Sequence, residues 1–266
     1  MLNSRPDSHN TSFMPISPAE RYAQAIESGQ FMQDEAQAQA VQELDRVWKE
    51  LLTRYKASKK AFRRFRRQTY PKGVYMWGGV GRGKTWLMDQ FYESVPFRRK
   101  TRMHFHHFMQ HVHKELNKLS GQRNPLDSVA DQIYKNAVVI CFDEFFVSNV
   151  TDAMIISDLF QKLFERGVTL IATSNIAPEG LYKNGIHRDR FLPTIELVQK
   201  NCTVLNVDAG VDYRLRVLKQ AQLFKHPLSN DAQAWMFERF QALTHTQTLS
   251  RSEEHTSELQ SLRHIS

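Results

Sequence analysis

The chain has 266 residues, of which 41% are hydrophobic, and its formal net charge is +8. This length and hydrophobic content are enough for one large α/β domain, with or without a small appendage. It contains no apolar run near the roughly 20 residues of a membrane-spanning helix, and its first residues have neither an apolar signal core nor the arginine content of a mitochondrial presequence. We therefore expect a cytoplasmic protein in which residues 1–17 are disordered.

The chain from Pro18 to about Tyr55 is predicted to be helical, with a break at Gly29. In the second part, apolar residues between Val41 and Leu52 recur every three or four positions. This spacing predicts a helix with one face packed on a core.

The positive charge is concentrated directly after this helical region. The stretch from Lys56 to Lys72 holds eight Lys or Arg residues and no acidic one, and outside it the basic residues equal the 28 acidic ones in number. Such a stretch can contact nucleic acid, an anionic membrane surface or an acidic protein partner, or it can be a solvated helix. Charge alone does not choose among these interpretations.

Short apolar strands then alternate with helices. Strands are predicted at residues 73–77, 102–106, 137–142, 168–172 and 202–207, and helices at residues 107–119 and 151–166, with a further helix starting near Lys84. Strands that alternate with helices favour a parallel sheet covered on both faces. The predicted fold class is therefore α/β.

The segment "GGVGRGKT" follows the first of these strands and fits the pattern Gly-x-x-x-x-Gly-Lys-Thr from Gly78 to Thr85. Glycines let successive backbone N–H groups point inward at an anion, and the following helix adds its own unpaired N–H groups. The alternative is a flexible glycine turn, but the flanking strand and helix favour a phosphate-binding loop. Candidate nucleotide-binding residues are Gly78, Gly79, Val80, Gly81, Arg82, Gly83, Lys84, Thr85 and Trp86.

The buried strand "AVVICF" ends in Asp143 and Glu144. In open α/β folds, ligands bind at the carboxyl edge of the sheet. We therefore expect Asp143 to hold Mg²⁺ together with the Thr85 hydroxyl, Lys84 to reach the β- and γ-phosphates, and Glu144 to polarise the attacking water. The alternative is an acidic strand end that merely faces solvent.

Two later residues are candidates for the same chemistry. Asn175 follows the strand "VTLIATS" and can hydrogen-bond the γ-phosphate or the lytic water, although it can equally be a helix cap. Arg190, like Arg188, precedes the last strand, and an arginine there can stabilise charge on a phosphoryl group, if necessary from a neighbouring subunit. The alternative is a pair of surface arginines at a helix end.

Histidines and cysteines give weaker signals. His107 and His111 stand four residues apart, but zinc sites usually need a third protein ligand, so we expect structural or phosphate-side packing here. His104 and His106 are expected on one strand face. Cys141 and Cys202 lie in apolar strand-like runs and are predicted to be buried thiols.

Several longer segments carry a resemblance to a known family. "GVYMWGGVGRGKTWLMDQFY", "HFHHFMQHVH", "VVICFDEFFVSNVTDAMI", "LIATSNIAPEGLYKNGIHRDRFLPTI" and "VDAGVDYRLR" make the chain similar to the ZapE and Afg-type family of AAA+-like P-loop ATPases. The resemblance implies an ATPase that works as a homo-oligomer, and its bacterial members are tied to the division ring and FtsZ. It implies Mg²⁺-dependent ATP hydrolysis that remodels a protein partner.

Two other functions remain open from the residues alone. One is a nucleic-acid-directed ATPase, such as a helicase loader, that uses the stretch from Lys56 to Lys72. The other is an ATP-binding switch or scaffold, which has less need of a base such as Glu144 beside Asp143.

The end of the chain departs from the family. The segment "RSEEHTSELQS" resembles an in-frame translation of a sequencing adapter. We therefore expect an ATPase domain over residues 18–220 that includes the N-terminal helical segment, an incomplete helical lid over residues 221–250, and a tail over residues 251–266 that is not native sequence.

Overall fold

The structure, a computed structural model, describes residues 15–29, 34–58 and 70–208. All of these belong to the first of the two units into which the chain divides, Met1–Val211. The expectations for the disordered start up to residue 14, for most of the basic stretch, for the lid and for the tail lie outside the described residues.

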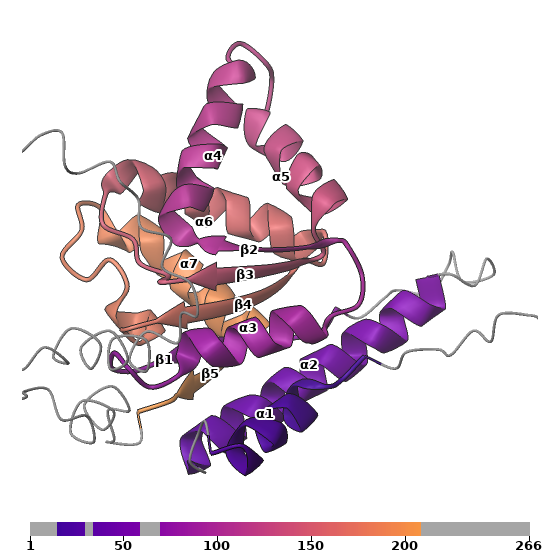
Figure 1. The fold of residues 1–266 in the computed structure, drawn as a ribbon. Helices are drawn as coiled ribbons and strands as arrows, with labels where there is room; N and C mark the ends of the chain where they lie inside the picture. The colour runs from indigo at the N-terminus through magenta and orange to yellow at the C-terminus, as the bar shows by residue number, and fades with distance from the viewer. Residues whose placement is uncertain (1–14, 30–33, 59–69, 209–266) are drawn as a thin grey trace, which may run out of the picture. The chain divides into compact units, whose positions relative to one another are not determined.

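Five parallel strands form a single sheet among the described residues, in the order β2-β3-β4-β1-β5 (Figure 1). They are β1 (Gly73–Trp77), β2 (Lys100–His104), β3 (Val139–Asp143), β4 (Thr169–Ser174) and β5 (Cys202–Asn206). The parallel sheet expected from the alternation of strands and helices is confirmed.

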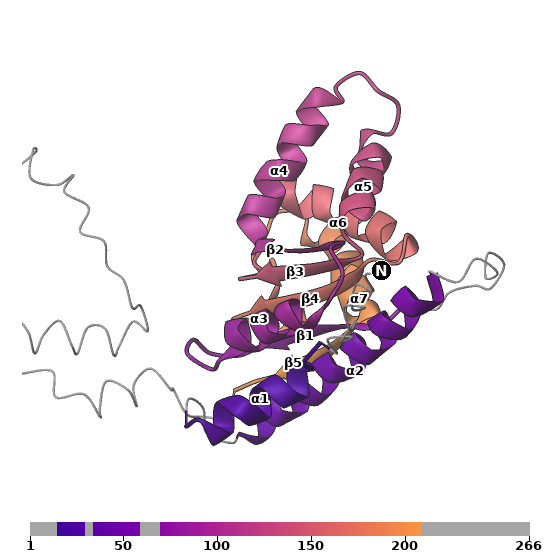
Figure 2. The ribbon, with the colours of Figure 1, turned by 45° about the vertical axis from the view of Figure 1, so that its right-hand side comes forward.

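Helices cover both faces of this sheet (Figures 1 and 2). One face carries α1 (Pro18–Glu27), α2 (Glu35–Ser58) and α3 (Lys84–Ser94). The other carries α4 (Phe105–Lys118), α5 (Pro125–Asn136), α6 (Val150–Glu165) and α7 (Arg188–Asn201), with the short 3-10 helix η1 (Pro178–Gly180) before α7.

The sheet separates two hydrophobic cores. Successive side chains of a strand point to opposite faces, so Tyr75 packs under α4–α7 while Val74 and Met76 pack under α1–α3. In β3, Phe142 packs on the side of α4–α7 and Cys141 packs on the side of α1–α3. Burial on both faces explains why residues 139–142 of β3 and residues 170–172 of β4 are apolar runs in the sequence.

The first strand and the helix after the glycine-rich loop begin where the sequence predicts. The second strand lies two residues earlier than predicted: β2 ends at His104 and α4 begins at Phe105. The reason is packing: Phe105, Phe108, Met109 and Val112 are all buried at helical spacing, which favours a helix from Phe105 onward. His106 therefore lies in α4 and does not share a strand face with His104.

Cys141 and Cys202 are both buried and free, as predicted. They lie in β3 and β5, with β4 and β1 between them in the sheet, too far apart for a disulfide. Burial raises the pKa of both thiols, so they stay protonated near neutral pH. Within the described ranges, no helix has the length and apolar character to cross a bilayer.

The neighbours Phe145 and Phe146 give a matched test of this packing. Phe145 is fully buried and its ring lies 4.5 Å from that of Phe105, whereas Phe146 is 58% exposed. We expect Phe145→Ala to lower the free energy of unfolding by about 3–5 kcal/mol, because it leaves a cavity between α4 and the sheet. Phe146→Ala should change it by less than about 0.5 kcal/mol. Denaturant unfolding measures both, and equal losses would contradict this assignment of the core.

Candidate active site

The residues singled out in the sequence meet at the edge of the sheet where the strands end. The loop of Gly78 to Thr85 follows β1, Asp143 ends β3, and Asn175 follows β4. Because β4 lies between β1 and β3, the three segments are neighbours at one edge. This is the edge at which open α/β sheets bind ligands.

The glycine-rich loop presents its backbone to this edge. Gly81 and Gly83 both have a φ of 79°, a left-handed conformation that residues with a Cβ rarely adopt. Gly83 is also the N-cap of α3, and no side chain caps the helix there. The first N–H groups of α3 are therefore available to an anion.

Lys84 lies within the curve of this loop and is 7% exposed. Its ammonium donates hydrogen bonds to the carbonyl oxygens of Gly78 (2.8 Å) and Gly79 (2.7 Å), and to Asn175 Oδ1 at 3.4 Å. The structure thus brings together Lys84 and Asn175, which stand far apart in the sequence.

Asp143 is the most connected carboxylate of the site and is only 4% exposed. Its Oδ1 accepts hydrogen bonds from the hydroxyls of Thr85 (2.9 Å) and Thr173 (2.6 Å), and its Oδ2 accepts one from Arg102 at 3.2 Å. Asp89 holds Arg102 from the other side, with 2.6 Å between Arg102 Nε and Asp89 Oδ1. The hydrogen bond to Asp89 raises the pKa of Arg102, and Asp143 acts in the same direction.

The oxygen atoms of Thr85 and Asp143 fit a Mg²⁺ ion. Mg²⁺ prefers oxygen ligands, and in phosphate sites it takes one or two carboxylates together with substrate phosphates and waters. The Thr85 hydroxyl and the Asp143 carboxylate are adjacent at 2.9 Å, beside the loop that presents N–H groups to an anion. These two residues are the protein ligands that Mg²⁺ would have here.

Glu144 differs sharply from its neighbour. Its φ is 53°, a costly conformation for a residue other than glycine, and its N–H donates to Thr173 Oγ1 at 3.2 Å. Its side chain is 73% exposed, and its Oε2 lies 3.8 Å from Nδ1 of His104. The buried Asp143 and the exposed Glu144 therefore have separate surroundings, which suits separate roles.

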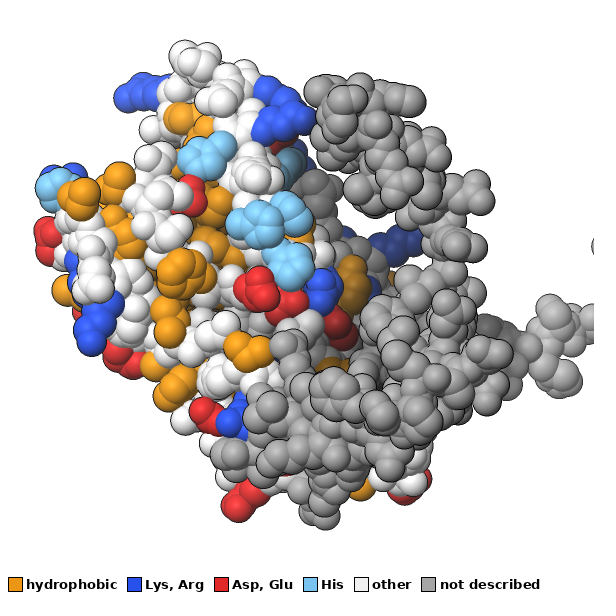
Figure 3. Space-filling model, turned by 60° about the vertical axis from the view of Figure 1, so that its left-hand side comes forward, with side chains coloured by type: hydrophobic (Ala, Val, Ile, Leu, Met, Phe, Trp, Pro, Cys, Tyr) orange, Lys and Arg blue, Asp and Glu red, His pale blue; other side chains and the backbone are white. Residues whose placement is uncertain are grey.

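A group of histidines lies beside Glu144. The ring of His104 is 5.9 Å from that of His106 and 6.0 Å from that of His107, and Figure 3 shows histidine side chains gathered next to acidic ones on this face. In the described part of the chain, no group of three or more His, Cys, Asp or Glu residues is arranged to hold a metal.

Other residues of the loop face away from its centre. Val80 is 53% exposed, and Trp86 packs its ring against that of Tyr22 on α1. Arg82 Nε lies 2.9 Å from Asp208 Oδ1, and the Arg82 carbonyl oxygen accepts a hydrogen bond from Gln37 on α2 at 3.0 Å. The side chain of Arg82 thus supports the loop from outside, and its backbone remains the part available to phosphate.

The two candidate arginines have different surroundings. Arg188 donates to the carbonyl oxygens of Leu181 (3.0 Å) and Glu179 (2.6 Å), which fixes the turn before α7. Arg190 is exposed in the first turn of α7, and its side chain has no ion pair or hydrogen bond to the described residues of the site. The structure does not bring Arg190 into contact with Lys84 or Glu144 of the same chain.

Sequence reasoning missed part of the network. Arg102 carries a charge within a strand, which signals a partner on a neighbouring element, but the partner depends on the pairing of β2 with β3. The run "VTLIATS" does not indicate that Thr173 would link the Asp143 carboxylate to the backbone of Glu144. No local pattern in the sequence indicates that Gln37 would donate a hydrogen bond to the Arg82 carbonyl oxygen of the loop.

Several known proteins are similar to this chain. The model of the family "AFG1-like ATPase" matches residues 16–265. The chain is 46% identical over 240 residues to the "Cell division protein ZapE" of Escherichia coli K12, covering 86% of this chain and 64% of that protein. It is 44% identical over 162 residues to "Lactation elevated protein 1 homolog B" of Danio rerio, covering 57% of this chain and 32% of that protein.

Among solved structures, AMPPCP-bound DnaA from Aquifex aeolicus is similar with a TM-score of 0.51 and 15% identity, covering 89% of this chain and 65% of that one. A likeness at this level of identity shows the fold alone, a parallel sheet flanked by helices, and confirms the predicted α/β fold class.

Lys84 is the first residue to test. We expect Lys84→Ala to weaken ATP binding by about 100-fold or more, because the phosphates lose a charge-assisted partner within the loop. Lys114→Ala, which removes an exposed lysine of α4, should leave affinity unchanged. Titration with a fluorescent ATP analogue measures both, and similar affinities for the two variants would contradict the phosphate-loop assignment.

Proposed function

This chain belongs to the AFG1-like ATPase family, and from that premise we propose that it hydrolyses ATP in a Mg²⁺-dependent reaction that drives remodelling of a protein partner in bacterial cell division. The observation that carries the proposal is the arrangement of Lys84, Thr85, Asp143 and Glu144 at one edge of the sheet. The chain spans about two thirds of the length of its Escherichia coli relative, 64%.

Phosphate binding falls to the loop and the start of α3. The loop N–H groups and the uncapped helix end attract the negative charge, and Lys84 adds its ammonium. Thr85 and Asp143 would hold Mg²⁺, which would neutralise charge on the phosphates when bound. Asn175, within 3.4 Å of the Lys84 ammonium, can hydrogen-bond the γ-phosphate or the attacking water.

Glu144 is the proposed general base. A base has to reach a water molecule in line with the terminal phosphate, and the exposed Glu144 carboxylate projects beside the buried Asp143. Thr173 Oγ1 accepts a hydrogen bond from the Glu144 N–H and donates one to the Asp143 carboxylate, so the end of β4 positions the backbone from which the Glu144 side chain projects. Proton transfer to such a group contributes about 10²–10⁴-fold to a rate.

Arg190 is proposed to act across a subunit boundary. An arginine that serves a neighbouring subunit must be exposed in its own, as Arg190 is. Since α7 runs into β5 and β5 is parallel to β1, the first turn of α7 lies toward the edge that carries the phosphate loop. A homo-oligomer would therefore complete each site with the Arg190 of the next subunit.

The cell-division role rests on the 46% identical relative, which is named a cell division protein. FtsZ is the proposed partner by family resemblance, and the cytoplasm is the proposed location. If single-stranded nucleic acid raises ATP turnover with a steep salt dependence and FtsZ does not, the protein is a nucleic-acid-directed ATPase instead.

Glu144→Gln separates binding from hydrolysis. We expect it to bind ATP normally and to lower turnover by about 10²–10⁴-fold, because the amide cannot accept a proton. Glu196→Gln, on the exposed part of α7, should turn over ATP normally. Phosphate release and nucleotide affinity are measured on both. If the Glu144→Gln variant turns over ATP as fast as the unchanged protein does, Glu144 is not the general base.

Arg190→Ala tests the subunit-crossing role. We expect turnover to fall by about 10³-fold or more, with an unchanged melting temperature. Mixing Arg190→Ala with Glu144→Gln should restore part of the activity, because mixed oligomers contain sites with both groups intact. A lowered melting temperature without any rescue would instead make Arg190 a structural residue.

A further inference from the structure

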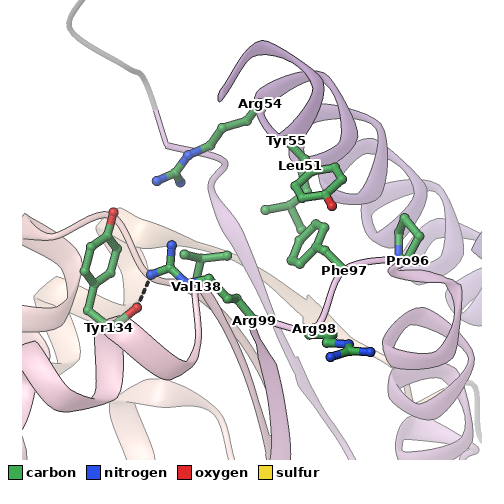
Figure 4. Close-up of a pocket in the computed structure, with 9 residues that line it drawn as sticks. All are labelled: Leu51, Arg54, Tyr55, Pro96, Phe97, Arg98, Arg99, Tyr134 and Val138. Carbon is green, nitrogen blue, oxygen red and sulfur yellow. Dashed lines mark hydrogen bonds between the residues drawn. The ribbon is translucent and has the colours of Figure 1, made fainter. Parts of the chain in front are cut away.

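A second hollow lies at the opposite edge of the sheet, where the strands begin. Its volume is about 560 Å³, and it is lined by the last turns of α2, the loop between α3 and β2, and the end of α5 (Figure 4). This pocket is separated from the ATP site by the length of the strands. None of the residues assigned to that site lines it.

The floor of the pocket is apolar. Leu51 and Phe97 are 2% and 6% exposed, and the rings of Phe97 and Tyr55 lie 5.2 Å apart. Val138, just before β3, lies on the same floor. Such a surface gains free energy when it covers an apolar side chain of a ligand.

Two arginines line the side of the pocket toward Tyr134, and each guanidinium group is held by neighbouring groups. The guanidinium of Arg54 lies 4.2 Å from the ring centroid of Tyr70 and donates to the carbonyl oxygen of Gly167 at 3.1 Å. The guanidinium of Arg99 lies 4.9 Å from the ring centroid of Tyr134 and donates to the Tyr134 carbonyl oxygen. In Figure 4 both turn toward Tyr134. Arginines held in this way are preorganised to bind carboxylate or phosphate in a bidentate manner.

These arginines have no acidic partner in the described part of the chain. Five other arginines there each face a carboxylate within the distance of an ion pair, namely Arg21, Arg46, Arg82, Arg102 and Arg166. Arg54, Arg98 and Arg99 all line the pocket. None of these three arginines forms an ion pair with a carboxylate of the described residues. Burial lowers the pKa of Arg54, and the positive charge of Arg99 acts in the same direction. The pocket is therefore a concentration of uncompensated positive charge.

We propose that this pocket binds an acidic peptide segment of a protein partner, with an apolar side chain on the floor and carboxylates on Arg54 and Arg99. The proposal rests on the proposed function in one respect: the pocket would be the place where the remodelled protein partner docks. Single-stranded nucleic acid fits less well, because it binds by stacking bases on open aromatic faces. Here guanidinium groups lie over the rings of Tyr70 and Tyr134, and Tyr55 packs on Phe97.

The test uses the full chain and a fluorescein-labelled peptide, Asp-Glu-Leu-Phe-Asp-Glu, followed by fluorescence anisotropy. Arg54→Gln and Arg99→Gln should each weaken binding about tenfold, because each removes charge-assisted hydrogen bonds to a carboxylate. Arg123→Gln, an exposed arginine of the loop between α4 and α5, is the matched control and should bind as the unchanged protein does. Replacing Leu and Phe of the peptide by Ser should weaken binding by a similar factor.

Three results would overturn the proposal: no measurable binding of the peptide, equal binding by Arg99→Gln and Arg123→Gln, or tighter binding of a labelled thymidine oligonucleotide that depends on Arg54 and Arg99. Arg99 is exposed, so its variant should fold, and the melting temperature of each variant verifies this. ATP turnover is measured on the same samples. Normal ATP turnover without peptide binding would reject the peptide-binding role of this pocket and would leave the proposed ATPase function unaffected.

Discussion

The buried carboxylate of Asp143 is the constraint on which the rest of the site depends. A charge taken out of water is tolerated only when hydrogen bonds and opposite charge compensate it. Here the compensation comes from three other elements: Thr85 on α3, Thr173 on β4 and Arg102 on β2. The requirement to solvate one carboxylate therefore fixes how a helix and two strands meet at the end of β3.

The same network explains the contrast between two adjacent acids. Thr173 accepts a hydrogen bond from the Glu144 N–H while it donates one to Asp143. Chain direction changes at Glu144, where φ is positive, and the next residue, Phe145, returns to the core. One carboxylate is thus kept inside and the next is sent out to solvent, although the sequence places them side by side.

The parts of the site that follow from local chemistry could be predicted from the sequence. A curled loop needs its glycines within a few positions, so the stretch from Gly78 to Thr85 marks both the loop and the start of α3. Two-sided burial makes residues 139–142 of β3 and residues 170–172 of β4 apolar, so the sequence predicts both strands. The strand β2, "KTRMH", is only half-buried and lacks such a run, so its end was misplaced. The part played by Arg102 depends on strand order, which no local pattern contains.

The helix α2 contacts the phosphate loop through Gln37, and through Arg54 it lines the pocket at the opposite edge of the sheet. These two contacts are separated by about 25 Å of continuous helix. Adding or deleting one residue between them would turn one contact by about 100° relative to the other and break at least one of them. Point substitutions on the exposed side of α2 leave this relation intact, whereas a change in its length does not. The number of residues between Gln37 and Arg54 is therefore under a stricter constraint than the identity of most of them.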